Sequence, residues 1–343
     1  MRKLGALGIA AIFLIAAMLV SALVGAADLN PLDTVAALAD KIPFVHLPSG
    51  LSPLDRAVLF QIRLPRVVLC ALVGGLLSMA GAGYQGVFRN PLVDSGLLGA
   101  SAGAGLGATL AIVYFGAVGP GAIPPAAFLG SLGGVAVAYL TGAAASRRTG
   151  FGDGVATLLL AGIAVGFFFT AVQTLVLQRS AEQDVQTVYN WLLGSLSGAT
   201  WQQVVSILPY ATVSIVVVLL HGRHLDVLAV GDEEARALGM RPATVRLIVV
   251  AACALATASA VAFSGLIGFV GIIVPHMARR LGGPGYRSVL PLSLLGGAGF
   301  LVLADTLART VLSPAELPIG VVTAVVGAPA FVWILRSTQG GRT

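Results

Sequence analysis

The long apolar stretches of this sequence contain very few side chains that could do chemistry, and Asp305 and Arg309 are the main exception. On a helix, two residues four apart lie one turn apart on the same face, where opposite charges form an ion pair. Ionisable residues inside a membrane are costly and often mark a transport pathway. The pair therefore has two interpretations, a local ion pair or a functional group in a path across the membrane.

The source of energy for any transport is restricted by what the sequence lacks. It contains no GxxxxGK[ST] loop, so we expect the chain to hydrolyse no nucleotide and to bind no cofactor of its own. Carriers driven by ion gradients hold carboxylates or histidines within the bilayer, and the centres of these apolar stretches are nearly bare of them. Energy would then come from a partner that touches the charged segment 221–241. An ion-coupled secondary transporter, and a channel or scaffold without coupled transport, remain as alternatives.

The histidines and cysteines do not predict a metal site. Three histidines fall on or near the predicted inner side of the membrane: His221, His224 and His276. His221 and His224 have a spacing that metal ligands can use, but no cysteine or carboxylate trio joins them, and we interpret them as loop side chains. His46, in an outer loop, is a weak candidate for contact with a haem ligand. Cys70 and Cys253 lie in apolar stretches and are interpreted as small packing residues.

The elements that carry these residues must lie mostly in lipid. The chain has 343 residues, of which 57% are hydrophobic and 10% are charged, with a mean hydropathy of +0.95. A soluble domain has about 25% charged residues, and one membrane span needs about 20 apolar residues. We predict an all-α integral membrane protein with a single transmembrane domain over residues 1–343. Ten spans fit, at residues 4–25, 63–86, 95–115, 122–145, 154–178, 200–220, 242–263, 266–281, 288–311 and 318–336.

The orientation of these spans follows from the distribution of positive charge. The first stretch could be a cleaved signal peptide, but its length and the apolar chain after it favour an uncleaved span. With the N-terminus inside, the inner loops hold 14 of the 20 lysines and arginines, and the outer side holds 6. Cytoplasmic loops carry an excess of these residues, so both termini are predicted to be cytoplasmic.

Three connecting segments have features of their own. The outer loop 26–62 contains four prolines, so we expect a folded loop without long helices. In the inner segment 221–241, Asp232 is expected to cap a short helix and Gly239 to lie near its end. Residues 187–198 are too short to span the bilayer, and they are predicted to form an interfacial or re-entrant helix with Trp191 at the headgroup level.

Motifs along nearly the whole chain resemble one family of transport proteins. The chain is similar to the FecCD or BtuC-like permease subunits of type II ABC importers, which take up vitamin B12, haem and ferric siderophores. The matching stretches are RLPR at 63–66, GYQGVFRNPLVDSGLLGASAGAG at 83–105, LLLAGIAVGFFF at 158–169, WLLGSLSGATW at 191–201, GDEEARALGM at 231–240, SGLIGFVGIIVPHMARRLGG at 264–283, VLADTLART at 302–310 and ELPIGVVTAVVGAPAFVWIL at 316–335.

The resemblance implies a BtuC-like permease fold in the inner membrane and a homodimer of ten-helix subunits around a central path, although pairing with a paralogue remains open. Two ABC ATPase subunits would use ATP and Mg on the cytoplasmic side, and a periplasmic or lipid-anchored substrate-binding protein would dock outside. Membrane lipid, but no nucleic acid, would be the other partner. The polar stretch RSAEQDVQTVYNW differs from that of haem members, which favours a siderophore or cobalamin over haem. The expected substrate is a ferric siderophore, with cobalamin or haem as alternatives.

The resemblance also assigns roles to three sets of residues. Arg63, Arg66 and Arg309 would grip acidic residues of the binding protein, or alternatively would anchor helix ends at the headgroups. Coupling to the ATPase, rather than a solvated loop helix, is implied for Leu225, Leu228, Asp232, Glu233, Glu234, Arg236, Leu238, Gly239 and Met240. The translocation path and its outer gate would include Gln173, Thr174, Trp191, Gly194, Ser195, Ser197 and Gly198. Of these, Gln173 and Thr174 have an alternative role in hydrogen bonds between helices.

Overall fold

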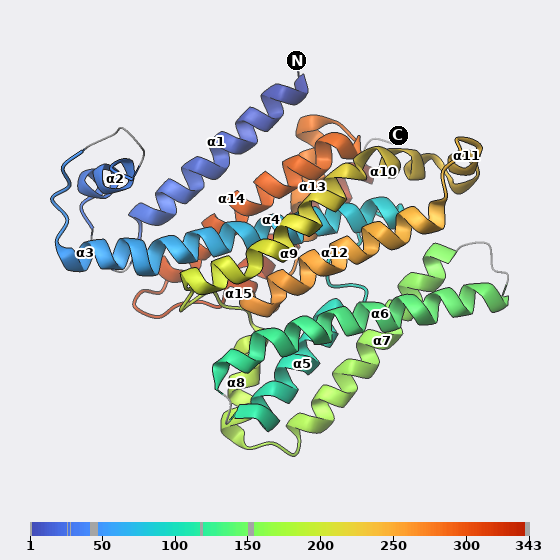
Figure 1. Cartoon of the computed structure of the whole chain (residues 1–343), viewed down its shortest axis with the longest axis horizontal. Helices are drawn as coiled ribbons and strands as arrows, with labels where there is room; N and C mark the ends of the chain where they lie inside the picture. The colour runs from blue at the N-terminus through green and yellow to red at the C-terminus, as the bar shows by residue number, and fades with distance from the viewer. Residues whose placement is uncertain are drawn as a thin grey trace.

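The structure is a computed structural model that describes residues 2–25, 27, 29–41, 47–116, 119–149 and 154–339. Every regular element within these residues is a helix. Figure 1 shows most of the long helices packed around α4 (Leu64–Phe88), with α10 (Gly222–Val230) and α11 (Asp232–Ala237) at one end of the bundle. The short helices α2 (Pro31–Ala39) and α3 (Pro53–Ala57) lie at the opposite end.

The centre of the fold is α4, which is buried along almost its entire length. It is surrounded by α9 (Trp201–Leu220), α12 (Pro242–Ser264), α13 (Val270–Gly282) and α14 (Tyr286–Thr310). Glycine makes this packing possible, because a Cβ at Gly81 would lie 2.3 Å from the carbonyl oxygen of Gly271 in α13. A Cβ at Gly74 would meet the carbonyl oxygen of Gly297 in α14 at the same distance. Helix backbones therefore touch directly on two sides of α4.

A second group of helices packs beside this centre. It consists of α5 (Ala100–Phe115), α6 (Ile123–Thr149) and α7 (Gly154–Leu177), and the shorter α8 (Glu182–Leu192) contacts α5 (Figure 1). The contact of α6 with α12 joins the group to the centre. A 3-10 turn, Pro120–Ala122, precedes α6.

The remaining elements close the two ends of the chain onto the bundle. Helix α1 (Arg2–Leu23) packs on α14, and α15 (Ile319–Gln339) contacts α13 and α14. Between α1 and α4, the described part of the predicted outer loop contains α2, α3 and a π-helical turn at Val58–Arg63. The last two run directly into α4, so one continuous helix begins at Pro53, ten residues before the predicted start of this span, and the predicted loop is shorter than expected. Cys70 and Cys253 are free and fully buried, as packing residues should be.

All ten predicted spans coincide with helices, but the structure does not give each of them the length of a full crossing. Within the described residues, seven helices are long and apolar enough to span a membrane: α1, the continuous segment Pro53–Phe88 that ends in α4, α6, α7, α9, α12 and α14. Helix α5 has 16 residues and α13 has 13. Seven crossings, rather than ten, are therefore supported by length and composition alone.

Several predicted boundaries need correction. The span predicted from residue 266 begins only at Val270, because Gly265 and Phe269 adopt positive φ angles of 67° and 69°. The helix predicted at 187–198 runs instead over Glu182–Leu192, and the chain after it turns at Gly194 and Gly198, with φ angles of 75° and 74°. Positive φ is unfavourable inside a right-handed helix, so each of these residues ends or delays one.

The contact at Gly81 gives a first testable prediction. Gly81→Leu should destabilise the protein by more than the ~1–3 kcal/mol typical of overpacked cores, because the new side chain would meet backbone that cannot turn aside. Gly133→Leu in α6 is the matched control, since a Cβ there meets nothing within 4 Å. The measurement is denaturant unfolding in detergent micelles. Equal stability of the two variants would contradict the tight packing of α4 against α13.

Candidate functional site

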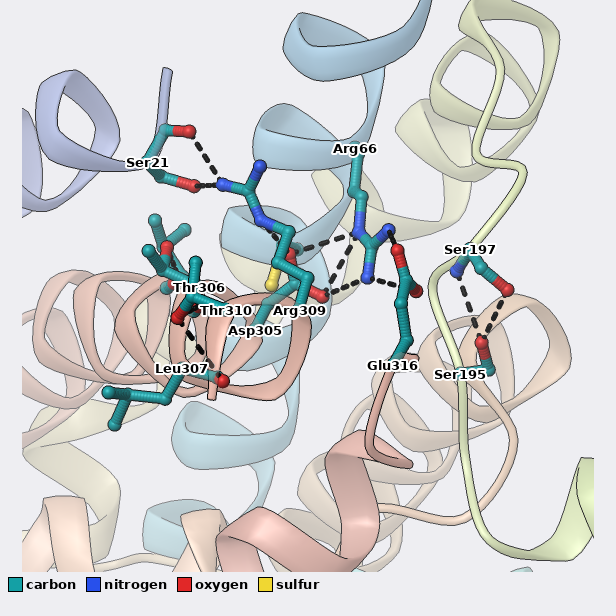
Figure 2. Close-up of polar contacts among 12 residues, drawn as sticks. Ser21, Arg66, Ser195, Ser197, Asp305, Thr306, Leu307, Arg309, Thr310 and Glu316 are labelled. Carbon is teal, nitrogen blue, oxygen red and sulfur yellow. Dashed lines mark hydrogen bonds and ion pairs between the residues drawn. The ribbon is translucent and has the colours of Figure 1, made fainter. Parts of the chain in front are cut away.

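A buried carboxylate and two arginines form an ion cluster at the ends of α4 and α14 nearest to α3. Asp305 is 1% exposed and accepts hydrogen bonds from Arg66, whose Nε lies 3.0 Å from Oδ2 and whose Nη2 lies 2.9 Å from Oδ1. Arg309 Nε lies 3.5 Å from Oδ2 of the same carboxylate. The local ion pair predicted from the spacing is confirmed, and Arg66 joins it from a second helix (Figure 2).

Two of the three predicted docking arginines also hold the end of α1. Arg309 donates to the carbonyl and hydroxyl oxygens of Ser21, at 2.5 and 2.6 Å (Figure 2). Arg63 donates to the carbonyl oxygens of Ala22 and Leu23, at 2.8 and 3.1 Å. The last carbonyls of a helix lack partners within it, so the arginines satisfy acceptors that would otherwise be unpaired. Both side chains are less than a tenth exposed, and their docking role stays a prediction.

Arg66 differs from the other two because its outer edge meets an exposed carboxylate. Its Nη1 and Nη2 donate to Oε1 and Oε2 of Glu316, at 2.9 and 3.0 Å, in a bidentate pair (Figure 2). Arg66 is 12% exposed and Glu316 is 41% exposed. Glu316 lies just before α15 and was not singled out from the sequence. In the sequence, its role is indicated only by its position at the start of the ELPIG motif, in a short turn between two helices.

The predicted outer gate is the segment that joins α8 to α9, residues 193–200, which we call the gate segment. It is held from two sides. The amide of Ser195 donates to the carbonyl of Ser264 at the end of α12, at 2.8 Å. The first amides of α15, at Ile319 and Gly320, donate to the carbonyls of Gly194 and Leu193, at 3.2 and 3.1 Å.

Within the gate segment, the hydroxyl oxygens of Ser195 and Ser197 lie 2.8 Å apart (Figure 2). Trp191, at the end of α8, is partly buried, and its carbonyl packs against Gly265 so closely that a Cβ there would lie 2.2 Å away. The predicted gate residues therefore lie where α8, α12 and α15 meet.

A cavity of about 480 Å³ lies between the start of α5, α7 and the end of α8. Gln173 lines it and donates to the hydroxyl of Thr109 at 3.0 Å, which is the interhelical hydrogen bond of its alternative role. Its place in a translocation path stays a prediction. Thr174 bonds back to Thr170 in its own helix and does not line the cavity. The lining contains no charged side chain: Gly96, Leu97, Gly99, Ser101, Ala102, Gly162, Ile163, Gly166, Phe167, Thr170, Gln173, Leu192 and Leu266.

The inner segment forms two short helices and not one. Gly231 separates α10 from α11, and Asp232 is the first residue of α11 rather than its cap. The Asp232 carboxylate instead pairs with Arg246, with Nη1 2.8 Å from Oδ2. Gly239 follows the helix with a φ of 79°, as predicted for its end.

The pairing of Asp232 fixes its charge. Partial burial alone would raise its pKa, but hydrogen bonds from Arg246 and the positive charges of Arg246, Arg89 and Arg236 hold the pKa below its usual value. Because the pKa of Asp232 is lower in the folded state than in the unfolded state, its ionised form stabilises the fold at pH values above the unfolded-state pKa of about 4. This stabilisation is lost as the pH falls below that value, toward the folded-state pKa.

Part of the predicted coupling set is at the surface, and part is not. Glu233, Glu234, Arg236 and Leu238 are exposed, and Leu238, Gly239 and Met240 line a cavity of about 350 Å³ with Arg223 and His224. Leu225 and Leu228 are fully buried within the chain, so the expectation that their side chains take part in contact with the ATPase needs correction. Their positions on α10 face the bundle, because α10 packs against α4 and α14.

The histidines form no metal site among the described residues, where no group of three or more His, Cys, Asp or Glu could hold a metal ion. The rings of His221 and His224 stack at 5.1 Å, and His221 Nδ1 lies 2.7 Å from the carbonyl oxygen of Val217. His46 lies outside the described residues.

Comparison with known proteins identifies the family. Residues 13–337 match the FecCD transport family. The chain belongs to this family. It is 40% identical to the cobalamin import system permease protein BtuC of Halobacterium salinarum, over 85% of this chain and 77% of that protein. It is 36% identical to the iron(3+)-hydroxamate import system permease protein FhuG of Bacillus subtilis, over 83% of this chain and 85% of the relative.

The fold agrees with that of a solved ABC transporter. A metal-chelate type ABC transporter in an inward-facing conformation superposes with a TM-score of 0.83 at 30% identity, covering 96% of this chain and 98% of the other. As a member of the FecCD family, the chain is a multi-pass membrane permease and not an enzyme. Hydrolysis of ATP belongs to a separate subunit in such importers.

The ion cluster gives a second testable prediction. Asp305→Asn should cost ~3–5 kcal/mol of unfolding free energy, because it leaves two buried guanidinium groups without their shared counter-ion. Glu316→Gln is the matched control, and it should cost at most ~1 kcal/mol because that carboxylate is exposed. Denaturant unfolding of the purified proteins measures both. A loss at Asp305 no larger than that at Glu316 would refute a structural role for the buried carboxylate.

Proposed function

We propose that this chain is the permease subunit of an ATP-driven importer that moves a ferric siderophore into the cytoplasm by alternating access. The observation that carries the proposal is the cavity between α5, α7 and α8, whose lining is apolar, hydroxyl or amide throughout. A wall without charges offers a bulky solute many weak contacts and no strong one, so the solute can enter and still leave. Tight selection would then belong to the substrate-binding protein.

The metal is proposed to cross inside its chelator. Among the described residues, no cluster of His, Cys, Asp or Glu is available to take the ion from a chelate. The names of the relatives support the same class of solute, since one is a cobalamin permease and another an iron(3+)-hydroxamate permease. Their similar identity to this chain keeps cobalamin, and with it haem, as the alternative substrates.

A second copy of the chain is proposed to complete the path. Helix α7 exposes large apolar side chains beside the cavity, with Leu160, Phe167 and Phe168 each more than 60% exposed. Helix α15 adds Val325, at 67%. A homodimer would cover these faces and enclose the cavities of the two subunits, with ten crossings in each and both termini in the cytoplasm.

The surface of α11 is the proposed contact with the ATPase subunits. Glu233, Glu234 and Arg236 are exposed there, while Asp232 is tied to Arg246 at the base of α12. Movement of α11 would therefore be passed to a helix that packs against α4 and α6. Leu238 and Met240 supply the apolar part of the surface.

An ion-coupled secondary transporter remains the alternative from another class. It requires an ionisable side chain that binds and releases an ion within the path. Asp305 is the buried carboxylate best suited by position in a span, but it is held by two arginines and does not line the cavity.

The test is uptake in cells that lack this gene, with labelled ferric hydroxamate siderophore, cobalamin and haem supplied separately. Loss of siderophore uptake alone supports the proposal, and loss of cobalamin or haem uptake alone assigns that substrate instead. Uptake driven by an ion gradient in vesicles without an ATPase subunit would favour the secondary transporter.

The coupling surface gives a third testable prediction. The double variant Glu233→Arg, Glu234→Arg should abolish uptake, because it reverses two exposed charges at the proposed ATPase contact. The protein should still fold, since neither side chain is buried. Uptake and co-purification of the ATPase subunit are measured together, with Glu182→Arg on α8 as the control for charge reversal. Normal uptake by the double variant would exclude this surface as the coupling site.

A further inference from the structure

Arg66 has two hydrogen-bonding edges with different surroundings. The edge toward Asp305 is closed, since that carboxylate is 1% exposed and also pairs with Arg309. The edge toward Glu316 is open, since Glu316 is 41% exposed. Guanidinium groups bind carboxylates in this bidentate geometry with high specificity. The open edge is therefore a carboxylate site that is already filled by a residue of the same chain.

The chain that follows Glu316 connects this site to the gate segment. The amide of Leu317 donates to the carbonyl of Ala308 in α14, at 2.8 Å. Two residues later, Ile319 and Gly320 donate to the gate segment carbonyls of Gly194 and Leu193. Only two residues lie between Glu316 and Ile319, which makes the first of these hydrogen bonds, so the position of Glu316 constrains where α15 meets the gate segment.

We propose that Glu316 is a latch for the outer gate, and that an acidic side chain of the docking binding protein replaces it on Arg66. This inference rests on the proposed function for the identity of the docking partner. When the partner's carboxylate takes the open edge of Arg66, the turn before α15 is released, and the hydrogen bonds to Gly194 and Leu193 lose their support. Glu316 is thus a positioning residue that makes opening of the gate depend on docking.

The difference in burial explains why a carboxylate of the partner would replace Glu316 and not Asp305 on Arg66. Removing Asp305 from Arg66 would leave buried charges uncompensated, which is strongly unfavourable. Releasing Glu316 moves an already exposed carboxylate into water, and an exposed ion pair contributes little. The inner pair keeps Arg66 in place while its outer partner changes.

The first test needs no partner. In the full-length permease in lipid nanodiscs, Glu316→Gln should speed hydrogen exchange of the Ile319 and Gly320 amides by about fivefold, as expected for the loss of one exposed ion pair. Glu182→Gln, which removes an exposed carboxylate from α8, should leave these amides unchanged. Unchanged exchange in the Glu316 variant, or an equal increase in both variants, would overturn the latch.

The second test measures replacement. With the binding protein that supports uptake in the reconstituted importer, the Glu316→Gln permease should bind about fivefold more tightly than wild type, because its own competing carboxylate has gone. Addition of this protein to the wild type should raise exchange at Ile319 and Gly320. Equal affinity of the binding protein for the two permeases would contradict the replacement of Glu316 by a carboxylate of that protein. If exchange responds to Glu316→Gln but no binding protein supports uptake, the proposed function fails and the latch between Arg66 and the gate stands.

Discussion

Direct contact between helix backbones is the constraint on which the rest of this structure depends. Lipid tails are as apolar as leucine, so no hydrophobic force draws membrane helices together, and close packing must hold them instead. At Gly74 and Gly81, α4 comes near enough to α14 and α13 for a backbone carbonyl to occupy the place of a side chain. Because α4 is enclosed in this way, its contribution to the candidate site, Arg66, lies at its end, and the other groups of the site are carried by the helices around it and by their ends.

The polar groups of the protein follow from this arrangement. At one end, α4 and α14 each contribute an arginine to Asp305, and a further arginine before α4 satisfies the end of α1. At the other end, α11 is fixed to α12 through Asp232 and Arg246. The polar side chains that line the cavity beside α7 are hydroxyl and amide groups, and none of the lining side chains is charged. Strong electrostatic contacts therefore hold the ends of helices, and the candidate path is left without them.

The sequence predicted the positions of helices well because each apolar stretch of suitable length became one. It failed at Val270 and Leu192, where the start of α13 and the end of α8 depend on positive φ angles at Phe269 and Gly194 rather than on hydropathy. For the site, the Asp305 and Arg309 pair could be predicted because its partners are four residues apart. The Arg66 and Glu316 pair could not, since its partners are 250 residues apart and meet only in the folded chain. Leu225 and Leu228 were misplaced because an amphipathic helix does not reveal which of two protein surfaces its apolar side meets.

The short length of α13 sets a limit on how the gate can move. Its 13 residues extend about 20 Å at 1.5 Å per residue, less than the ~30 Å of a hydrocarbon core. Non-helical backbone at 265–269 must cover part of the remaining depth, and backbone amides in lipid need protein partners. The Phe269 amide donates a hydrogen bond to the carboxylate of Asp94, and the neighbouring carbonyl of Ser264 accepts one from the Ser195 amide. A wide swing of the gate segment would separate the Ser195 amide from the Ser264 carbonyl. We therefore expect the proposed opening to keep this acceptor paired, either with Ser195 or with a new protein partner.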